Sequence, residues 1–522
     1  MPQKKQPMAL ESLALGAVRT WTKMVATHIM DPVCDALQQQ GVHQFATLLS
    51  TAILTINEAL YASVPWYLID SVAVQVLSSI DELVQETRTE STESEHRLHM
   101  QLYMARLKVI VSLSEAVAHP QLRTLDVSRW PKIIRHVLNG TLFKLSGLEK
   151  LDLGGGSSGW GTSEAEKNVL SGVVAMHNLT SLYLCLDCTD NILAAVAANC
   201  HRLQFLDVTS SRSVTDRSIP GLCSCTSLKT LKLHRTSITT KGYKTLLLSL
   251  PELREFGRCD VLGDVLESVA KNRKTPLGLH SLEGRDLGDT EMRLLTLMCP
   301  FLSRITLSHF EKVCDLSLLG QLERLSELKL SSCDFYSDKV FRLLELRGST
   351  ITQLHLEDVN ELDNHALFAI GRQCPNLNNF ELHHCELGEG VLSPYIKTDD
   401  LFESLQRLVC ISDGSSSTVE LLLCYSPNIR SVQLGSSTEV YDRTFSTILN
   451  HNPMRFLEEL RIHYSYDLSM RTVRKLMDSC GNLRVLSELE YWDGITEAEL
   501  KEFHHHIRTN NLELDITPTL SR

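Results

Sequence analysis

The sequence predicts an α/β solenoid, with short parallel strands on a concave face and helices on a convex face, preceded by an N-terminal all-α segment. Three observations predict this fold class. A short apolar pattern recurs at nearly constant spacing, the segments between its copies have apolar residues at helical spacing, and the pattern is missing before Leu122. We therefore expect a helical segment over residues 1–118 and a solenoid over residues 119–522.

The recurring pattern is Leu-x-x-Leu-x-Leu, with Ile, Val, Phe or Cys also allowed at the apolar places. Its copies start about 23 to 31 residues apart, which is the spacing of leucine-rich repeats. Because alternate side chains of a strand point to opposite faces, the apolar places of every copy face a shared core. The copies at Leu253 and Leu279 are degenerate. About fifteen units begin at Leu122, Leu148, Leu179, Leu203, Leu228, Leu253, Leu279, Leu302, Leu325, Ile351, Leu377, Leu405, Ile429, Leu457 and Leu483.

The segments that link these strands predict helices. NILAAVAANC at residues 191–200 and MRTVRKLMDSC at residues 470–480 have apolar residues at intervals of three and four. This spacing places the apolar side chains on one face of a helix. A single unit of this kind cannot bury its apolar face alone, so neighbouring units share one continuous core.

Composition and charge exclude several classes of protein. The 522 residues are 43% hydrophobic and 22% charged, as in ordinary globular proteins. The formal charge is −12, and no stripe of Lys and Arg is present, so nucleic acid is not an expected partner. No signal peptide and no run of about 18 apolar residues occurs, so we expect no membrane partner. The fifteen dispersed cysteines favour a reducing compartment, the cytoplasm or the nucleus.

Cysteines recur at fixed places within the repeats. One stands just before a predicted strand in four units and just after it in two, and the unit at Leu377 has both. These residues are Cys200, Cys299, Cys374, Cys480, Cys333 and Cys385. Over about four fifths of the chain, the sequence thus resembles the cysteine-containing leucine-rich repeats of F-box proteins and other substrate receptors of cullin-RING ubiquitin ligases. We interpret the cysteines as small buried side chains rather than as metal ligands or redox thiols.

The resemblance implies that the N-terminal segment docks on a cullin adaptor. Helical patterns cover about residues 9–29, 31–60, 65–87 and 98–118. The segment from Val64 to Val72 is similar to the cullin box of elongin-dependent receptors, with Pro65 and Leu68 at the matching places. An F-box in the same position would have Ser71 at a core place.

An elongin C-binding BC-box would precede this cullin box. The segment from Thr47 to Ile56 is similar to one, with Leu48 at the leucine place and Ala52 where the family has cysteine. A second candidate, residues 12–21, also has alanine at the cysteine place. The resemblance therefore implies elongin C or a Skp-type adaptor, and a cullin, as partners. The alternative is that the apolar residues pack against one another in a cap on the first repeat, namely Leu48, Ala52, Ile56, Leu68 and Val72.

No pattern in the sequence predicts a catalytic centre, a cofactor or a metal site, so we do not expect an enzyme. GGGSSGWG at residues 154–161 lacks the Gly-Lys-Ser/Thr ending of a phosphate loop. We interpret it as a loop that protrudes from the solenoid. His504, His505 and His506 are consecutive, and consecutive residues on a helix point in different directions. They favour a solvated helix over a zinc site.

The concave face is the predicted target-binding surface, because the non-core residues of the strands point outward there. The central residues of the strands are Asp126, Asp152, Tyr183, Asp207, Lys232, Glu283, Thr306, Lys329, His355, Glu381, Gln433 and Arg461. This row is acidic at its N-terminal end and mixed further on, which favours a basic or mixed-charge protein segment.

Together these observations predict a non-catalytic protein-binding module, the substrate-recognition subunit of a cullin-RING ubiquitin ligase complex. In this role the solenoid binds a protein substrate and the N-terminal helices bind the adaptor. The alternative is a leucine-rich-repeat scaffold or regulatory protein with no link to a ligase.

Overall fold

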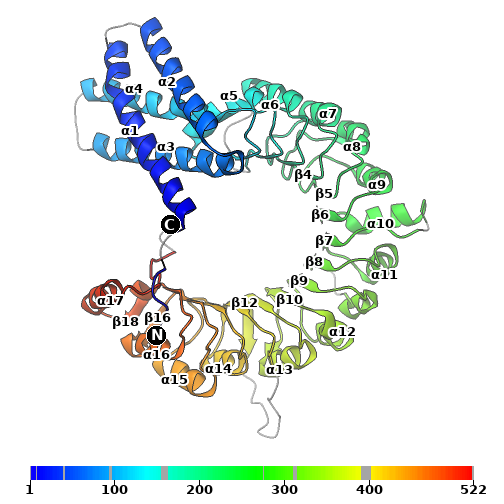
Figure 1. The fold of residues 1–522 in the computed structure, drawn as a ribbon. Coiled ribbons are helices and arrows are strands. Elements are labelled where there is room, and N and C mark those ends of the chain that lie inside the picture. The colour runs from blue at the N-terminus through cyan, green and yellow to red at the C-terminus, as the bar shows by residue number, and fades with distance from the viewer. Residues whose placement is uncertain are drawn as a thin grey trace. The chain divides into compact units, whose positions relative to one another are not determined.

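The structure is a computed structural model that describes residues 2–6, 9–38, 42–92, 97–154, 163–273, 275–309, 314–388 and 401–519. It contains two compact units: an N-terminal unit, Met8–Gly257, and a C-terminal unit formed by Met1–Pro7 and Arg258–Arg522. In both units short parallel strands lie side by side, and helices cover one face of the sheet (Figure 1). The predicted leucine-rich-repeat solenoid is therefore confirmed. The predicted domain boundary at residue 118 lies within the N-terminal unit and stays a prediction.

Four long helices precede the first strand in the N-terminal unit. They are α1 (Leu10–Gln38), α2 (Val42–Ser63), α3 (Ile69–Thr92) and α4 (Arg97–Ser112), joined by the short 3-10 helices η1 (Trp66–Leu68) and η2 (Leu113–Val117). The first helix packs against the other three, so the segment is a bundle. Its buried core includes Ile56, Leu60, Val72, Val76, Leu77, Ile80 and Val84.

The repeats of the N-terminal unit follow this bundle. Their strands are β1 (Thr124–Asp126), β2 (Lys150–Asp152), β3 (Ser181–Tyr183), β4 (Phe205–Asp207), β5 (Thr230–Lys232) and the first residues of β6 (Glu255–Cys259). Their helices are α5 (Lys132–Gly140), η3 (Leu142–Lys144), α6 (Ser163–Ala175), α7 (Asp190–Asn199), η4 (Asp216–Ser218), α8 (Ile219–Ser224) and α9 (Thr240–Ser249). The second leucine place of the pattern is in register from strand to strand and is buried, at Leu125, Leu151, Leu182, Leu206, Leu231 and Phe256.

The C-terminal unit continues the same arrangement. Its main strands are β7 (Ser281–Arg285), β8 (Arg304–Ser308), β9 (Glu327–Ser331), β10 (Gln353–Glu357), β12 (Asn379–Gly388), β13 (Arg407–Asp413), β14 (Ser431–Leu434), β15 (Glu459–Ile462) and β17 (Val485–Ser487). The short strand β11 (Leu362–Asp363) pairs with β12, and β16 (Ser465–Ser469) pairs with β18 (Trp492–Gly494).

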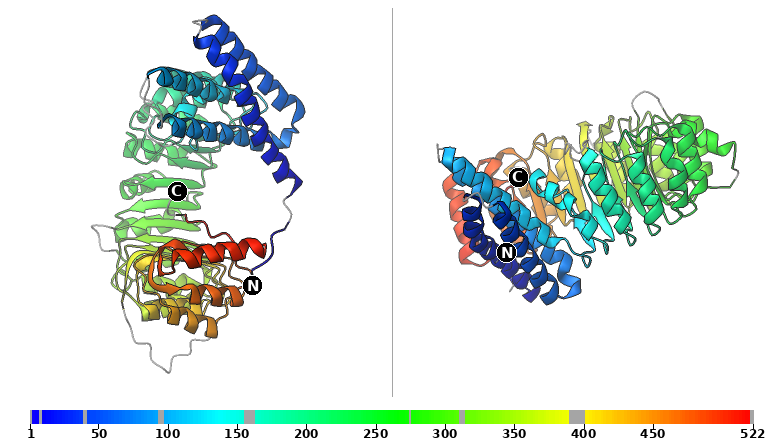
Figure 2. Two further views of the ribbon diagram at one scale, coloured as in Figure 1. Left: turned by 90° about the vertical axis from the view of Figure 1, so that its left-hand side faces the viewer. Right: turned by 90° about the horizontal axis from the view of Figure 1, so that it is seen from above.

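Helices lie along one side of these strands, as Figure 2 also shows. They are α10 (Leu262–Ala270), α11 (Asp289–Met298), η5 (Leu316–Gln321), α12 (Val340–Arg347), η6 (Gly348–Thr350), α13 (Asn364–Gln373), α14 (Ser416–Cys424), α15 (Asp442–His451), α16 (Met470–Ser479), η7 (Leu489–Tyr491) and α17 (Glu497–Thr509). The face of the sheet away from the helices is here called the open face. It is the face that the sequence analysis calls concave.

The degenerate unit at Leu279 keeps the fold by a different packing. Gly284 stands at the place of the third apolar residue of the pattern. A Cβ at this glycine would lie 2.9 Å from Cδ2 of Leu262 and 3.3 Å from side-chain carbons of Leu287 and Leu307. All three leucines are buried. Neighbouring side chains therefore fill the space that a leucine takes in the other units.

Threonine and aspartate side chains connect the starts of successive helices. Thr189 caps α7 with its side-chain oxygen. The carboxylate of the next residue, Asp190, accepts hydrogen bonds from the backbone N–H and the hydroxyl of Thr215, at 2.8 and 2.7 Å. Asp216 makes the same two contacts with Thr239, at 2.8 and 2.6 Å. In both places one repeat thus fixes the helix cap of the next one.

Candidate protein-binding surfaces

The structure divides the predicted adaptor-binding residues between the surface and the core. Thr47, Leu48 and Pro65 are exposed, Ala52, Val64 and Leu68 are half-buried, and Ile56 and Val72 are buried. Residues spaced by four drift about 40° per step around a helix, so the row from Leu48 to Ile56 turns from solvent into the bundle. Burial of Ile56 and Val72 stabilises the bundle and leaves neither side chain accessible to a partner in this conformation.

Exposed aromatic residues stand at the predicted cullin box. Trp66 and Tyr67 are 68% and 65% exposed, directly after Pro65, whose φ of −57° suits the start of a helix. Their rings meet edge to face with centroids 5.9 Å apart. The guanidinium carbon of Arg123 lies 5.3 Å from the centroid of the Trp66 ring. Trp, Tyr and Arg are the residue types that most often anchor protein interfaces.

The bundle is fixed to the first repeat near these aromatic residues. The hydroxyl of Tyr61 donates a hydrogen bond to the carbonyl oxygen of Val117 at 2.5 Å, and its ring stacks on that of His119 with centroids 3.8 Å apart. Burial, and then the charge of Asp70, raise the pKa of Tyr61, which keeps its hydroxyl a donor. Asp70 in turn accepts a hydrogen bond from the backbone N–H of Arg123 at 3.0 Å.

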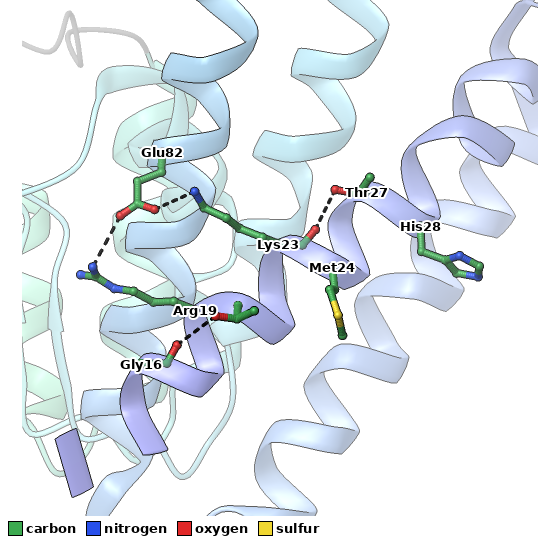
Figure 3. A pocket seen from close by; sticks show the side chains of 8 residues that line it. Gly16, Arg19, Lys23, Met24, Thr27, His28 and Glu82 are labelled. Carbon is green, nitrogen blue, oxygen red and sulfur yellow. Dashed lines mark hydrogen bonds and ion pairs between the residues drawn. The ribbon is translucent and has the colours of Figure 1, made fainter. Parts of the chain in front are cut away.

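A groove runs along the first helix (Figure 3). On one side of it Nζ of Lys23 lies 2.9 Å from Oε2 of Glu82 and 2.8 Å from Oε1 of Glu86. Nη1 of Arg19 lies 3.5 Å from Oε1 of Glu82. These pairs join α1 to α3, and the hydrogen bonds that Lys23 donates to Glu86 and Glu82 raise its pKa. Exposed ion pairs contribute about 0 to 1 kcal/mol each. Met24, 62% exposed, points away from Glu82 in Figure 3 and offers an apolar contact.

The predicted central row of the open face is acidic in the N-terminal unit. Strand register aligns Asp126 with Asp152, Asp152 with Tyr183, and Tyr183 with Asp207. Burial raises the pKa of Asp152 against the hydrogen bond from the backbone N–H of Gly154, and the charges of Asp126 and Asp207 add to the rise. Tyr183 stacks on Phe205 with centroids 4.3 Å apart. This surface combines negative charge with aromatic rings.

Each of these aspartates also closes the turn after its own strand. Oδ1 of Asp126 accepts hydrogen bonds from the backbone N–H and the hydroxyl of Ser128, at 3.0 and 2.5 Å. Asp207 makes the same pair of contacts with Thr209, at 3.0 and 2.6 Å. Such Asx turns are local structure. One oxygen of each carboxylate is thus used by the fold. Oδ2 of Asp207 lies 3.9 Å from Nζ of Lys232 on the next strand, and Oδ2 of Asp126 lies 3.9 Å from Nε of Arg129.

The C-terminal unit presents a row of paired charges on its open face. Nζ of Lys329 lies 2.9 Å from Oε2 of Glu357, and Nδ1 of His355 lies 2.9 Å from Oε2 of Glu381. Nη2 of Arg461 lies 2.5 Å from Oε1 of Glu459. Lys329 and Arg461 are therefore each paired with a carboxylate, on the adjacent strand and on the same strand respectively. Row position Val409, between Glu381 and Gln433, is buried rather than polar.

The repeat cysteines are buried thiols. Cys200, Cys299, Cys374 and Cys480 are each 0% exposed and each cap the C-terminus of a helix. Burial raises the pKa of each of these four to about 12. At that pKa almost no thiolate exists near neutral pH, and the thiolate is the form that binds metals and reacts. Their geometry agrees with a packing role.

The remaining motifs differ in what the structure describes. Of GGGSSGWG, residues 155–161 lie outside the described part of the chain. His505 and His506 are exposed on α17, whose Phe503 and Ile507 are buried. That arrangement agrees with a solvated helix, and the described residues place no third ligand beside these histidines.

Comparison with known proteins gives little. No family model matches the chain, and no curated protein matches its sequence. Among solved structures, the chain is similar to one in the crystal structure of the Rad7 and Elc1 complex in yeast, with 15% identity over 70% of this chain and 90% of that chain and a TM-score of 0.41. At this level the match gives no information about what the chain binds. No described helix has the length and hydropathy needed to cross a membrane.

Some surface residues escaped the sequence reasoning. Trp66 and Tyr67 lie inside the predicted box, but their exposure depends on how the bundle packs. Phe205, Glu357 and His383 are strand residues that flank the central row, and only the register between units places them beside it. All three stand at outward strand positions, two residues from the central one.

Proposed function

We propose that this chain is a non-catalytic protein-recognition subunit of a cullin-RING ubiquitin ligase in the cytoplasm or nucleus. In this role the open face binds a protein substrate, and the N-terminal bundle binds elongin C or a Skp-type adaptor. The chain would act by proximity. Holding a substrate beside a ubiquitin carrier raises the effective concentration of its lysines without chemistry by this chain.

The observation that carries the proposed binding of an adaptor is the concentration of exposed apolar side chains on the bundle. Nearly half of the large hydrophobic residues that are exposed in the described chain lie on these four helices and η1, about a fifth of the sequence. They are Leu10, Leu13, Met24, Leu48, Leu54, Trp66, Tyr67 and Met104. Contiguous exposed apolar surface typically marks a protein interface, and the rings of Trp66 and Tyr67 lie edge to face with centroids 5.9 Å apart.

The acidic row supports the proposed binding of a protein substrate by the open face. Asp126, Asp152 and Asp207 set a negative potential on the open face, and Tyr183 and Phe205 add rings on which a cation can lie. Nζ of Lys232 already lies 5.8 Å from the centroid of the Phe205 ring. A lysine- or arginine-rich segment is the target class that such a surface favours.

The decisive experiment measures binding of the full chain to purified elongin B–elongin C and to a purified Skp-type adaptor. The test variant carries Leu48→Glu and Trp66→Glu, two exposed positions where a charge costs little stability. The matched control carries Leu297→Glu and Tyr466→Glu, which are 67% and 73% exposed on the repeats. We expect the test variant to lose at least tenfold in affinity and the control to bind as the unchanged chain does.

A scaffold without a ligase is the second candidate, and burial of Ile56 and Val72 favours it. If the unchanged chain binds neither adaptor, the ligase role is wrong and the scaffold role remains. If test and control variants lose binding equally, the adaptor uses another surface.

A further inference from the structure

Two adjacent strands of the C-terminal unit bring together three metal-ligating side chains. The parallel register of β10 and β12 pairs His355 with Glu381 and Glu357 with His383. Residues two apart on a strand share a face, so all four side chains lie on the open face. One ligand atom each of His355, Glu381 and His383 lies within 4.8 Å of the other two. All three residues are half-buried.

The carboxylate of Glu381 is oriented for such a role. Its Oε2 faces both imidazoles, 2.9 Å from Nδ1 of His355 and 3.6 Å from Nε2 of His383. Its Oε1 is held from the other side by Nδ2 of Asn379 at 3.2 Å and Nε of Arg407 at 3.5 Å. Ligand atoms around a tetrahedral zinc ion lie about 3.3 Å apart, which is close to both distances from Oε2.

An outer shell supports His355. Its Nε2 is buried without a hydrogen-bond partner and lies 3.7 Å from Oε2 of Glu357. Glu357 is itself fixed by Nζ of Lys329 at 2.9 Å and by the hydroxyl of Ser331 at 3.3 Å. A histidine that binds a metal through one nitrogen usually donates the other N–H to a carboxylate. Glu357 stands where that carboxylate is needed.

We infer that His355, Glu381 and His383 form a binding site for a divalent transition metal ion, zinc by its donor set, on the open face. Two imidazoles and one carboxylate are a common set of three zinc ligands, with a fourth position left open. The two rings stack at 4.7 Å with their planes 18° apart, so they must turn about χ2 to aim both lone pairs at one ion. That torsion is broad in histidine.

The three residues leave the fourth coordination position of a tetrahedral ion open. Water or a side chain of a bound protein can complete the coordination there. The inference is independent of the proposed ligase role, because it concerns the ion alone.

The test is zinc titration of the chelator-treated full chain by calorimetry, with competition against a chromogenic chelator. The background carries His504→Ala, His505→Ala and His506→Ala, so that the exposed histidines of α17 do not contribute. We expect one zinc per chain, and at least tenfold weaker binding after Glu381→Gln, which keeps the shape of the side chain. The matched control is His463→Ala, a half-buried histidine on the same face.

Cobalt supplies a second readout, because its visible absorption reports imidazole and carboxylate coordination. Loss of that band in His383→Ala, with unchanged circular dichroism, would support the site and exclude misfolding as the cause. Binding that is absent in the full chain, or equal in the Glu381→Gln and His463→Ala variants, would overturn the inference.

Discussion

The carboxylate of Asp190 binds both the backbone N–H and the hydroxyl of Thr215, one repeat further along the chain. Thr215 is itself the cap of η4, so one aspartate orders the beginning of the next helical segment. Since stability in a solenoid comes from each unit and its nearest neighbours, this contact belongs to the coupling between repeats.

Replacing this aspartate tests the coupling. We expect Asp190→Ala to lower the free energy of unfolding by about 1 to 3 kcal/mol, because it removes hydrogen bonds to a charged acceptor and weakens a cap. Urea unfolding followed by circular dichroism measures the change. Glu267→Ala, at an exposed helix position, is the control and should stay within about 0.5 kcal/mol. Equal effects would mean that the cap contact is not stabilising.

Acid should weaken these contacts. Burial alone would raise the pKa of Asp190, but hydrogen bonds from Ser218 and Thr215 outweigh it and lower the pKa below its ordinary value. Burial would likewise raise the pKa of Asp442, but hydrogen bonds from Ser469 and Thr472 outweigh it and lower this pKa. The unfolded pKa is about 3.9, so each carboxylate stabilises the fold above that value and loses its effect as pH falls through the lower folded pKa.

The measurement is the urea midpoint between about pH 5 and about pH 3. We expect it to fall less over this interval in the double variant Asp190→Asn, Asp442→Asn than in the unchanged chain. A variant with the same fall would show that these two carboxylates do not contribute to acid sensitivity.

The junction between bundle and repeats depends on Tyr61. Removing its hydroxyl in Tyr61→Phe leaves the carbonyl oxygen of Val117 without that donor, and we expect a loss of about 1 kcal/mol. Hydrogen exchange should quicken in residues 113–125 before it does elsewhere. Tyr67→Phe, at an exposed ring, is the control, and faster exchange there of equal size would contradict the assignment.

The repeat thiols should be unreactive while the chain is folded. Cys374 is 0% exposed and burial raises its pKa to about 12, which leaves a thiolate fraction on the order of 10⁻⁴ at pH 8. Cys223 on α8 is half-buried. Alkylation followed by mass spectrometry should therefore modify Cys223 first and Cys374 only in denaturant. Early modification of Cys374 would show that its repeat opens.

The acidic row should bind basic peptides by charge. We expect a labelled oligolysine to bind the double variant Asp126→Asn, Asp152→Asn several-fold more weakly, in a fluorescence anisotropy titration at low salt. Asp264→Asn with Asp478→Asn changes the net charge equally at exposed helix positions and should leave binding unchanged. Added salt should reduce the difference, because the Debye length falls to about 8 Å at 0.15 M. Equal weakening by both pairs would indicate a non-specific effect.

Much of the fold was predictable because the repeat marks its own core. Leu125, Leu151 and Leu182 are buried at the same place in successive strands, as their spacing in the sequence predicts. The unit at Leu279 is degenerate because Gly284 replaces a core residue. Its strand β7 forms nonetheless, because the side chains of Leu262 and Leu287 fill the space of the missing side chain. The sequence alone does not reveal which neighbours fill this space.

The surfaces were only partly predictable. The pattern assigns His355 and Glu381 to the open face, and they lie there. His383 stands two residues beyond the central position, and only the register of β10 and β12 brings it beside them. On the bundle, the spacing of four from Leu48 to Ile56 indicates a shared face, but the packing of four helices decides where that face turns inward. Tertiary contacts of this kind follow from the arrangement of helices and not from periodicity.

Because the strands share one register, the outward positions on the open face are structurally equivalent and regularly spaced. Lys329, His355 and Glu381 occupy one column, each supplied by a different repeat, with strands about 4.8 Å apart. Because the backbone and core are the same whichever polar residue stands at an outward position, a single point mutation changes the surface chemistry at one position and leaves the fold intact. A chain built in this way can gain, lose or shift a binding chemistry along its length in small evolutionary steps, with no insertion and no new fold.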